Sequence, residues 1–134
     1  MSKVERDSIS FFYVGRNEND DKYLVPKIGE TKQRLKNREK HIRNHGYENF
    51  KMLGCLMLLS ATAAERKHIE SEVRAKMEKY GKNIKNDHFL VRASRAKKYR
   101  DAQYTAFALI ALGYAIDCCE REHYPYVFKF FEEN

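Results

Sequence analysis

The segment that most constrains the fold of this chain is the run Phe50-Lys-Met-Leu-Gly-Cys-Leu-Met-Leu-Leu59, in which Lys51 is the only charged residue. The run is short and nearly all apolar, and it follows a helical pattern. These properties predict a strand that is buried in the middle of a sheet. Cys55 lies inside the run, which indicates a small buried hydrophobic residue.

Two segments near the start of the chain also have the composition of strands. The segments from Ile9 to Arg16 and from Tyr23 to Gly29 are rich in aromatic and β-branched residues. A polar, acidic stretch separates them, so we expect a hairpin. Pro26 lacks an amide donor, and we therefore expect the second strand to lie at a sheet edge or to contain a bulge there.

Two helices are expected to follow these strands. Thr31 is a suitable N-cap for a strongly basic helix that runs to about Asn44. Thr62 and Glu65 have the spacing of a capping box, which predicts the start of a second helix. A helical stripe follows this box, before Gly81 ends the helix; its members are Ile69, Val73, Met77 and Tyr80.

The C-terminal part of the chain predicts a short strand over His88–Val91 and a long helix from about Ser94 to Glu122. The order β-β-α-β-α predicts an α+β fold, with a small three-stranded, mixed or antiparallel sheet flanked by helices. We expect one domain over residues 1–134, with a core over 9–91 and a helical extension over 94–123. The broad apolar surface of that helix predicts burial against the domain or against a second copy in a homodimer.

The formal net charge of +7 and the isoelectric point near 9.3 predict an attraction to polyanions such as nucleic acid. A solvated basic surface is the alternative explanation. The N-terminus lacks the apolar core of a signal peptide, and the longest apolar run, over 106–116, is shorter than the roughly 20 residues of a membrane span. We therefore expect a cytoplasmic protein without a membrane partner. The three cysteines do not form a disulfide framework.

Five short motifs occur in an order that resembles the GIY-YIG endonuclease superfamily. They are Phe11-Phe-Tyr13, Lys27-Ile-Gly29-Glu-Thr31, Leu35-Lys-Asn-Arg38, Ile69-Glu70-Ser-Glu72-Val73 and His88-Phe89. The Lys-Ile-Gly form is similar to the viral and bacterial branch in which lysine replaces the second tyrosine. Phe11 and Phe12 depart from the Gly-Ile of the first family motif, and only its tyrosine is present.

The resemblance implies metal-dependent hydrolysis of phosphodiester bonds in nucleic acid, with double-stranded DNA as the expected substrate. It implies that Glu70 binds Mg²⁺ or Mn²⁺ and that Arg38 stabilises the transition-state phosphate. Tyr13 would act as the base or position the water, and Lys27 would lower the pKa of Tyr13 or hold the phosphate. Gly29 and Thr31 would be structural residues of the motif.

Each of these side chains also has a structural explanation. Tyr13 has the properties of a half-buried strand aromatic, and Lys27 those of a charge at a strand edge. Arg34 competes with Arg38 for the arginine role, although the Leu-x-x-Arg spacing favours Arg38. By helical geometry, Glu70 lies at the margin of the buried face and Glu72 points further into solvent. The five histidines show no zinc-binding spacing.

Basic residues cluster over 32–43, 66–85 and 92–100, as a surface that faces phosphates requires. On the first of these segments, we expect nucleic-acid contacts from Lys32, Arg34, Lys36, His41 and Arg43. Three hypotheses compete: an active nuclease of the phage, restriction or repair type, an inactive nucleic-acid-binding module on the same fold, and a protein-interaction factor that docks through its long helix.

Overall fold

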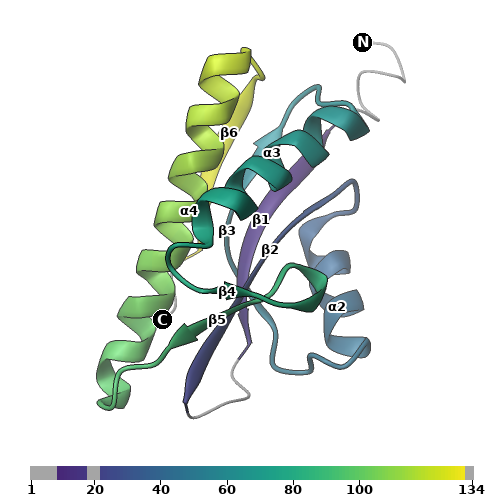
Figure 1. The fold of residues 1–134 in the computed structure, drawn as a ribbon. Helices are drawn as coiled ribbons and strands as arrows, with labels where there is room; N and C mark the ends of the chain where they lie inside the picture. Colours follow the sequence, from purple (N-terminus) through teal and green to yellow (C-terminus); the bar gives the residue numbers. More distant parts are fainter. Residues whose placement is uncertain (1–8, 18–21, 132–134) are drawn as a thin grey trace.

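The computed structural model of the protein describes residues 9–17 and 22–131. These residues form an antiparallel sheet with helices on both faces, in the strand order β4-β5-β2-β1-β3-β6 (Figure 1). The strands are β1 (Ser10–Asn17), β2 (Tyr23–Thr31), β3 (Lys51–Leu58), β4 (Lys82–Asn83), β5 (Phe89–Arg92) and β6 (Tyr126–Phe130). The helices are α2 (Leu35–Asn44), α3 (Ala63–Met77) and α4 (Arg100–Glu122), and the 3-10 turns are η1 (Lys85–Asp87) and η2 (Lys97–Tyr99).

The α+β class is confirmed, but the prediction of a three-stranded sheet was wrong. The described sheet has six strands because β5 and β4 extend it beyond β2, and β6 extends it beyond β3. The short strand predicted over His88–Val91 is confirmed as β5. The sequence did not predict β4 and β6, because short strands form mainly where a neighbour offers hydrogen-bond partners. The long helix begins at Arg100, later than predicted, because residues 97–99 form a 3-10 turn.

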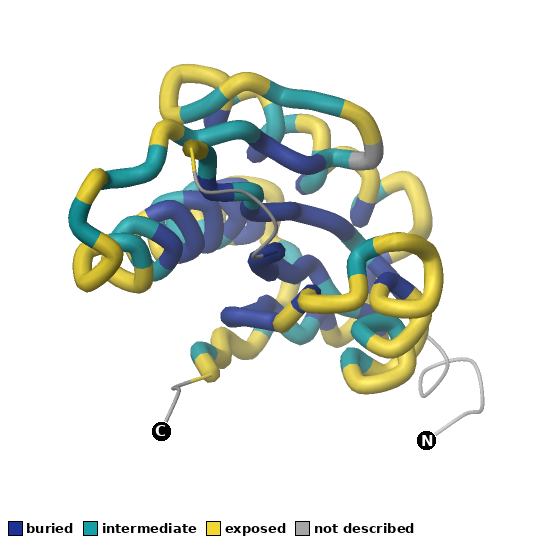
Figure 2. The backbone as a smooth tube through the Cα atoms, turned by 90° about the horizontal axis from the view of Figure 1, so that it is seen from below, coloured by how far each residue is buried: buried dark blue, intermediate teal, exposed yellow. Residues whose placement is uncertain are grey.

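The two faces of the sheet bury different side chains of β1. Phe12 and Val14 belong to the larger core, which α3 and α4 cover. Tyr13 lies in a smaller core that includes Ile42 of α2 and Cys55 of β3. This arrangement follows from the alternation of side chains along a strand. Figure 2 shows the buried segments running through the centre of the molecule.

The central strands largely agree with the sequence prediction. β3 is an interior strand between β1 and β6, as its apolar run predicted. β2 is also interior, so the prediction of an edge strand was wrong, although the ladder between β2 and β5 is short. This ladder contains only two pairs, Tyr23 with Arg92 and Leu24 with Val91. An isolated bridge also joins Lys27 to His88. Pro26 therefore lies where this ladder is interrupted and no amide donor is required.

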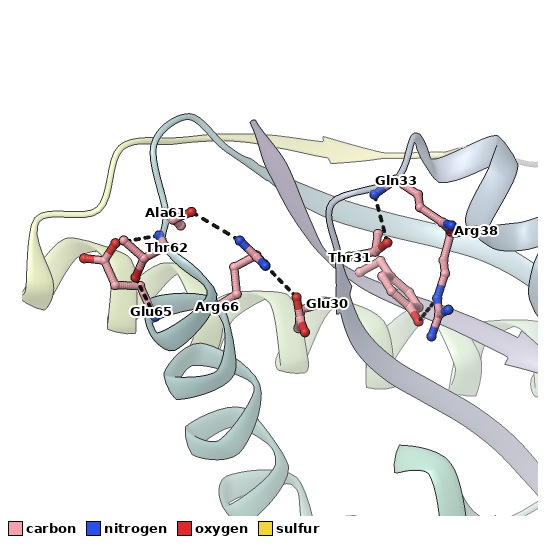
Figure 3. A network of polar contacts seen from close by, with 9 residues as sticks. Glu30, Thr31, Gln33, Arg38, Ala61, Thr62, Glu65 and Arg66 are labelled. Carbon is pink, nitrogen blue, oxygen red and sulfur yellow. Dashed lines mark hydrogen bonds and ion pairs between the residues drawn. The ribbon is translucent and has the colours of Figure 1, made fainter. Parts of the chain in front are cut away.

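The helix caps agree with the prediction at α3 but not at α2. Thr62 and Glu65 form the capping box that their spacing predicted. Thr31, in contrast, is the last residue of β2, and its hydroxyl accepts a hydrogen bond from the amide of Gln33 at 3.0 Å (Figure 3). Thr31 therefore supports the turn after the strand, and α2 begins at Leu35. Tyr80 lies beyond the end of α3 and is 40% exposed, so it does not continue the buried stripe.

The segment Lys97–Glu122 is long and apolar enough for a membrane span by length and composition alone. Much of its apolar surface is used inside the protein, where residues of α4 belong to the larger core and pack against α3 and the sheet. The residues of this buried face are Tyr104, Phe107, Ala108, Ala111, Leu112, Ala115, Cys118 and Cys119. The core helix of a globular protein has these properties.

Candidate active site

Tyr13 of β1 and Gly29 of β2 lie directly opposite each other in the antiparallel ladder. Opposite residues project to the same face of a sheet, so the ring of Tyr13 is carried over Gly29. A Cβ atom on Gly29 would collide with the phenol oxygen and ring of Tyr13. Glycine is needed here for space, and it lets the sheet hold the fully buried phenol beside β2.

α2 brings a guanidinium to this phenol. Leu35 and Ile42 pack into the smaller core, and Arg38 lies between them in the helix. Its Nε donates a hydrogen bond to the phenol oxygen of Tyr13 at 3.3 Å, and Figure 3 shows Arg38 reaching down from the helix. Burial raises the pKa of Tyr13, although the hydrogen bond and charge of Arg38 oppose the shift. The phenol is therefore protonated at neutral pH.

Lys27 lies on β2, on the same sheet face as Tyr13. Its Nζ donates a hydrogen bond to the carbonyl of Ile28 at 3.3 Å and lies 5.8 Å from the centre of the Tyr13 ring. Only 6% of the residue is exposed. Burial lowers the pKa of Lys27 to about 8, and the carboxylates of Asp87 and Glu70 limit this shift. The amine can therefore lose its proton near neutral pH.

Two carboxyl groups, Glu70 on α3 and Asp87 in η1, interact beside these residues. Burial, followed by the charge and hydrogen bond of Asp87, raises the pKa of Glu70 to about 7. Burial also acts to raise the pKa of Asp87, but hydrogen bonds from Arg74 and Glu70 outweigh it and lower that pKa. Nη1 of Arg74 lies 2.7 Å from Oδ1 of Asp87 and 3.6 Å from Oε1 of Glu70. Asp87 is therefore the ionised member of the pair, and Glu70 changes protonation near pH 7.

A cleft of about 280 Å³ lies at this place. Its walls combine cationic, acidic and imidazole side chains with two apolar ones; the lining residues are Lys27, Arg38, His41, Ile42, His45, Tyr47, Asp87 and His88. The rings of Tyr47 and His88 stack at 4.3 Å, and those of His41 and His45 at 4.0 Å. The stacked rings give the cleft defined walls around its charged groups.

Of the four side chains that the sequence predicted as catalytic, Lys27 and Arg38 line the cleft, whereas Tyr13 and Glu70 are not among its lining residues. Arg38 contacts Tyr13 directly. The charges of Arg38 and Glu70 both influence the pKa values of Tyr13 and Lys27, so the four groups share one electrostatic environment. Glu72, the rival of Glu70 on α3, points elsewhere: it forms an ion pair with Arg121 of α4 and lies 3.8 Å from the amine of Lys76.

The residues expected to contact nucleic acid are exposed, but they differ in their surroundings. His41 lines the cleft. Arg43 is engaged within the protein, since its Nε donates to the carbonyl of Phe50 at 2.8 Å and its guanidinium pairs with Glu39 at 3.2 Å. Three others lie on or just before α2 with exposed side chains, namely Lys32, Arg34 and Lys36. Arg34 precedes the first residue of α2, and its carbonyl accepts the amide of Arg38.

Asp87, Arg74 and Tyr47 are site residues that the sequence did not indicate. Asp87 lies in a polar loop and has a φ of 60°, a left-handed conformation that aspartate adopts more readily than most residues. No spacing relates it to Glu70, because the tertiary packing of η1 against β2 brings the two together. Nothing in the local sequence could have marked these three residues.

A second group with metal-binding side chains lies between α3 and α4. Ligand atoms of His68, Glu72 and Cys118 lie within 4.8 Å of one another. The carboxylate of Glu72 already pairs with Arg121, however, and burial raises the pKa of the Cys118 thiol to about 11. The described contacts are therefore those of an ion pair between two helices, with a protonated thiol beneath it.

No family model, curated protein sequence or solved structure matches this chain. The geometry of the cleft and the sequence motifs that its residues belong to are therefore the features that indicate a function.

Proposed function

We propose that this protein is a metal-dependent endonuclease of the GIY-YIG type, which hydrolyses phosphodiester bonds of nucleic acid, with duplex DNA as the first substrate to test. One observation carries the proposal. Side chains from four separate elements, β1, β2, α2 and α3, share one electrostatic environment beside the cleft, which Lys27 and Arg38 line, and they are the same four that the motifs had singled out. A basic surface that only attracts nucleic acid by its charge would not require these four side chains to lie together.

Glu70 and Asp87 form a donor set that fits a hard divalent cation, and Asp87 lines the cleft. Carboxylate oxygens are the protein ligands that Mg²⁺ prefers, and Glu70 and Asp87 offer them side by side. The two carboxyl groups share the guanidinium of Arg74 as their common ion-pair partner, and the pKa of Glu70 is raised. Glu70 and Asp87 would hold the cation, which would displace the guanidinium of Arg74 from both carboxyl groups. When bound, Mg²⁺ supplies positive charge that stabilises the negative oxygens of the phosphate during hydrolysis.

The remaining groups suit the other requirements of hydrolysis. In this reaction water attacks phosphorus, the bond from phosphorus to the leaving oxygen breaks, and water loses a proton. The amine of Lys27, with its pKa near 8, is a better acceptor for that proton than the phenol of Tyr13, whose pKa is raised. The protonated phenol can orient the water, and Arg38 can bind a phosphate oxygen. The leaving oxygen takes its proton from solvent.

A nucleic-acid-binding module without catalysis is the second candidate. The observation that favours it is the complete burial of Tyr13, whose phenol is occupied by Arg38. The aromatic residues Phe11 and Phe12 at the first motif agree with this alternative. In such a module Lys27 and Arg38 would contact phosphates without turnover.

The test is a cleavage assay on plasmid and single-stranded DNA and RNA, with Mg²⁺, Mn²⁺ or EDTA. It compares the wild-type protein with Glu70→Gln, which keeps the shape of the side chain. Glu72→Gln is the matched control, because Glu72 lies two residues further along the same helix and pairs with Arg121. We expect metal-dependent nicking by the wild type and by Glu72→Gln, and none by Glu70→Gln.

Three results would contradict the proposal of a metal-dependent nuclease. Cleavage that persists in EDTA, or that Glu70→Gln leaves intact, would remove the metal role of Glu70. If all three proteins are inert but bind DNA equally, the binding module becomes the better conclusion. Weaker binding by Arg38→Gln would then identify the cleft as its phosphate contact.

A further inference from the structure

A second pocket, of about 340 Å³, lies at the other end of β2 from Gly29. Four of its seven lining residues are cationic, and none of the seven is acidic; the cations are Lys22, Arg92, Arg95 and Arg100. They come from the residue before β2, the end of β5, the loop after β5 and the start of α4. Figure 1 shows these segments together at one end of the molecule.

The loop that presents these arginines is held by hydrogen bonds. The side chain of Gln103 on α4 accepts the amide of Ser94 at 2.8 Å and donates to the carbonyl of Arg92 at 3.0 Å. Nε of Arg100 donates to the carbonyl of Ser94 at 3.2 Å, and the amide of Ala93 donates to the carbonyl of Lys22 at 3.0 Å. The backbone of the pocket is therefore arranged before any ligand arrives, which reduces the entropy lost on binding.

Strand β2 and the segment that contains β5 link this pocket to the candidate active site. Tyr23 and Arg92 are cross-strand partners that line the pocket, and Lys27 and His88 are cross-strand partners that line the cleft. Tyr23 and Lys27 are four residues apart on β2, so their side chains point to the same side, about 13 Å from each other along the strand. One strand of duplex DNA carries a charge about every 3.4 Å along its axis, so this separation spans about four phosphates.

We infer that the pocket formed by Lys22, Arg92, Arg95 and Arg100 is a second phosphate-binding site, which holds the backbone of the nucleic-acid substrate about four phosphates from the bond that is cleaved. The inference rests on the proposed function of the cleft. Arginine suits this role because its planar guanidinium matches the geometry of phosphate oxygens. The bound substrate would then lie along β2 and β5. It would contact the protein on one side of the cleaved bond, in the direction of the pocket.

The test measures binding in EDTA, so that it does not depend on cleavage. The probes are fluorescently labelled DNA duplexes of 8 and 24 base pairs, and affinity is measured over a range of salt concentrations. The variant Arg92→Gln/Arg95→Gln removes two charges from the pocket. The control Lys97→Gln/Lys98→Gln removes two charges from the adjacent turn η2, whose exposed lysines do not line the pocket.

We expect the pocket variant to bind the 24-base-pair duplex about tenfold or more weakly at 0.1 M salt. Its plot of log affinity against log salt should be less steep by roughly 1.8, since two phosphate contacts are lost. The control variant should change the affinity and the salt slope much less. In the pocket variant, the affinity for the 8-base-pair duplex should fall less than the affinity for the 24-base-pair duplex. Equal losses in the two variants, or unchanged binding in the pocket variant, would overturn the inference.

Free inorganic phosphate is an alternative ligand with the same chemistry as the phosphates of nucleic acid. A titration with inorganic phosphate distinguishes these two ligands. If inorganic phosphate stabilises the wild type but not the pocket variant against heat, while duplex affinity is equal in both, the pocket binds small anions and the inference fails. The nuclease proposal is tested apart from this experiment. Binding that depends on the pocket, without any metal-dependent cleavage, would reject only the nuclease proposal.

Discussion

Lys27 and Glu70 have pKa values that bring both groups into the physiological pH range. Burial lowers the pKa of Lys27 to about 8 and, with Asp87, raises the pKa of Glu70 to about 7. Shifted pKa values of this kind are concentrated at the functional sites of proteins, although networks of ion pairs also produce them. Predictions at the residue scale therefore concern pH as well as the loss of a side chain.

If Lys27 accepts the proton from water, the Lys27→Arg variant keeps the positive charge but cannot lose it. We expect the cleavage rate to fall by about 10² to 10⁴. In the wild type, the rate should rise with pH and level off above about 8, as the amine of Lys27 becomes neutral. The measurement is a pH–rate profile, with Lys32→Arg as an exposed control. An active Lys27→Arg with an unchanged profile would show that Lys27 only supplies charge.

The raised pKa of Glu70 makes stability depend on pH. The folded protein binds this proton more tightly than the unfolded chain, whose pKa is near 4.5, so stability decreases as the pH rises from about 4.5 to 7. In EDTA, Glu70→Gln should therefore melt at a higher temperature than the wild type at pH 8, with a smaller difference at pH 4.5. Mg²⁺ should stabilise only the wild type at pH 8. If the two proteins differ in melting temperature by the same amount at pH 4.5 and pH 8, the raised pKa of Glu70 is not the cause of the difference.

Gly29→Ala tests the space between β2 and Tyr13. The new methyl group would collide with the buried ring, and we expect a loss of about 1–3 kcal/mol in the free energy of unfolding. Gly113→Ala is the control, because no atom lies within 4 Å of its added Cβ and alanine favours the helix by about 1 kcal/mol. Urea titrations should show opposite signs. Equal effects of the two substitutions would mean that the phenol can move aside.

At the scale of elements, α3 is held to the sheet by a nearly buried ion pair. Arg66 is 6% exposed, its Nε lies 2.7 Å from Oε2 of Glu30 on β2, and its Nη1 donates to the carbonyl of Ala61 (Figure 3). The capping box at Thr62 fixes the start of the same helix. These two contacts position the first turn of α3 and, one turn later, the carboxyl group of Glu70.

Arg66→Met removes one partner of this pair and leaves the carboxylate of Glu30 largely buried. We expect a loss of about 3 kcal/mol in stability, together with reduced metal-dependent cleavage, because α3 carries Glu70. Arg121→Met is the control, since Arg121 is half exposed and its pair with Glu72 should contribute less than about 1 kcal/mol. Denaturation and cleavage are measured on the same samples. A loss no greater than that of the control would show that packing alone holds α3.

At the scale of the whole molecule, α4 shares one core with the sheet and α3. Leu112 is 1% exposed, and its Cδ1 lies close to Gly54 of β3, where an added Cβ would meet it at 2.9 Å. β6 then returns from the end of α4 to pair with β3. The segment predicted as a helical extension over 94–123 is therefore packed among the central elements.

Leu112→Ala tests whether α4 and the sheet unfold together. We expect a loss of about 2–5 kcal/mol, with amide exchange accelerating in β1 and β3 as well as in α4. Leu109→Ala is the control on the same helix, where the side chain is 46% exposed and the effect should stay within about 0.5 kcal/mol. Faster exchange in α4 alone would indicate that the helix is a separate unit.

The sequence by itself determined the elements whose signals lie within a few neighbouring residues. The apolar run of β3, the strands β1 and β2, the capping box of α3 and the basic character of α2 are all local patterns, and each was predictable from side-chain period or capping chemistry. The four candidate catalytic residues were predicted from motif order, and their roles stay a prediction. Local patterns locate an element's boundary only to within several residues, which is why Thr31 was predicted as the N-cap of α2, whereas Arg34 holds that position.

Only the tertiary structure decided which distant residues meet and how they titrate. The strands β4 and β6, which the sequence did not predict, exist because neighbouring strands offer hydrogen-bond partners. Asp87 joins Glu70, and Arg92 joins Lys22, because the sheet and its packed turns bring separate segments together. Burial then changes the pKa values of Lys27 and Glu70. These effects depend on through-space distance and on the exclusion of water, and neither quantity is written in the spacing of residues along the chain.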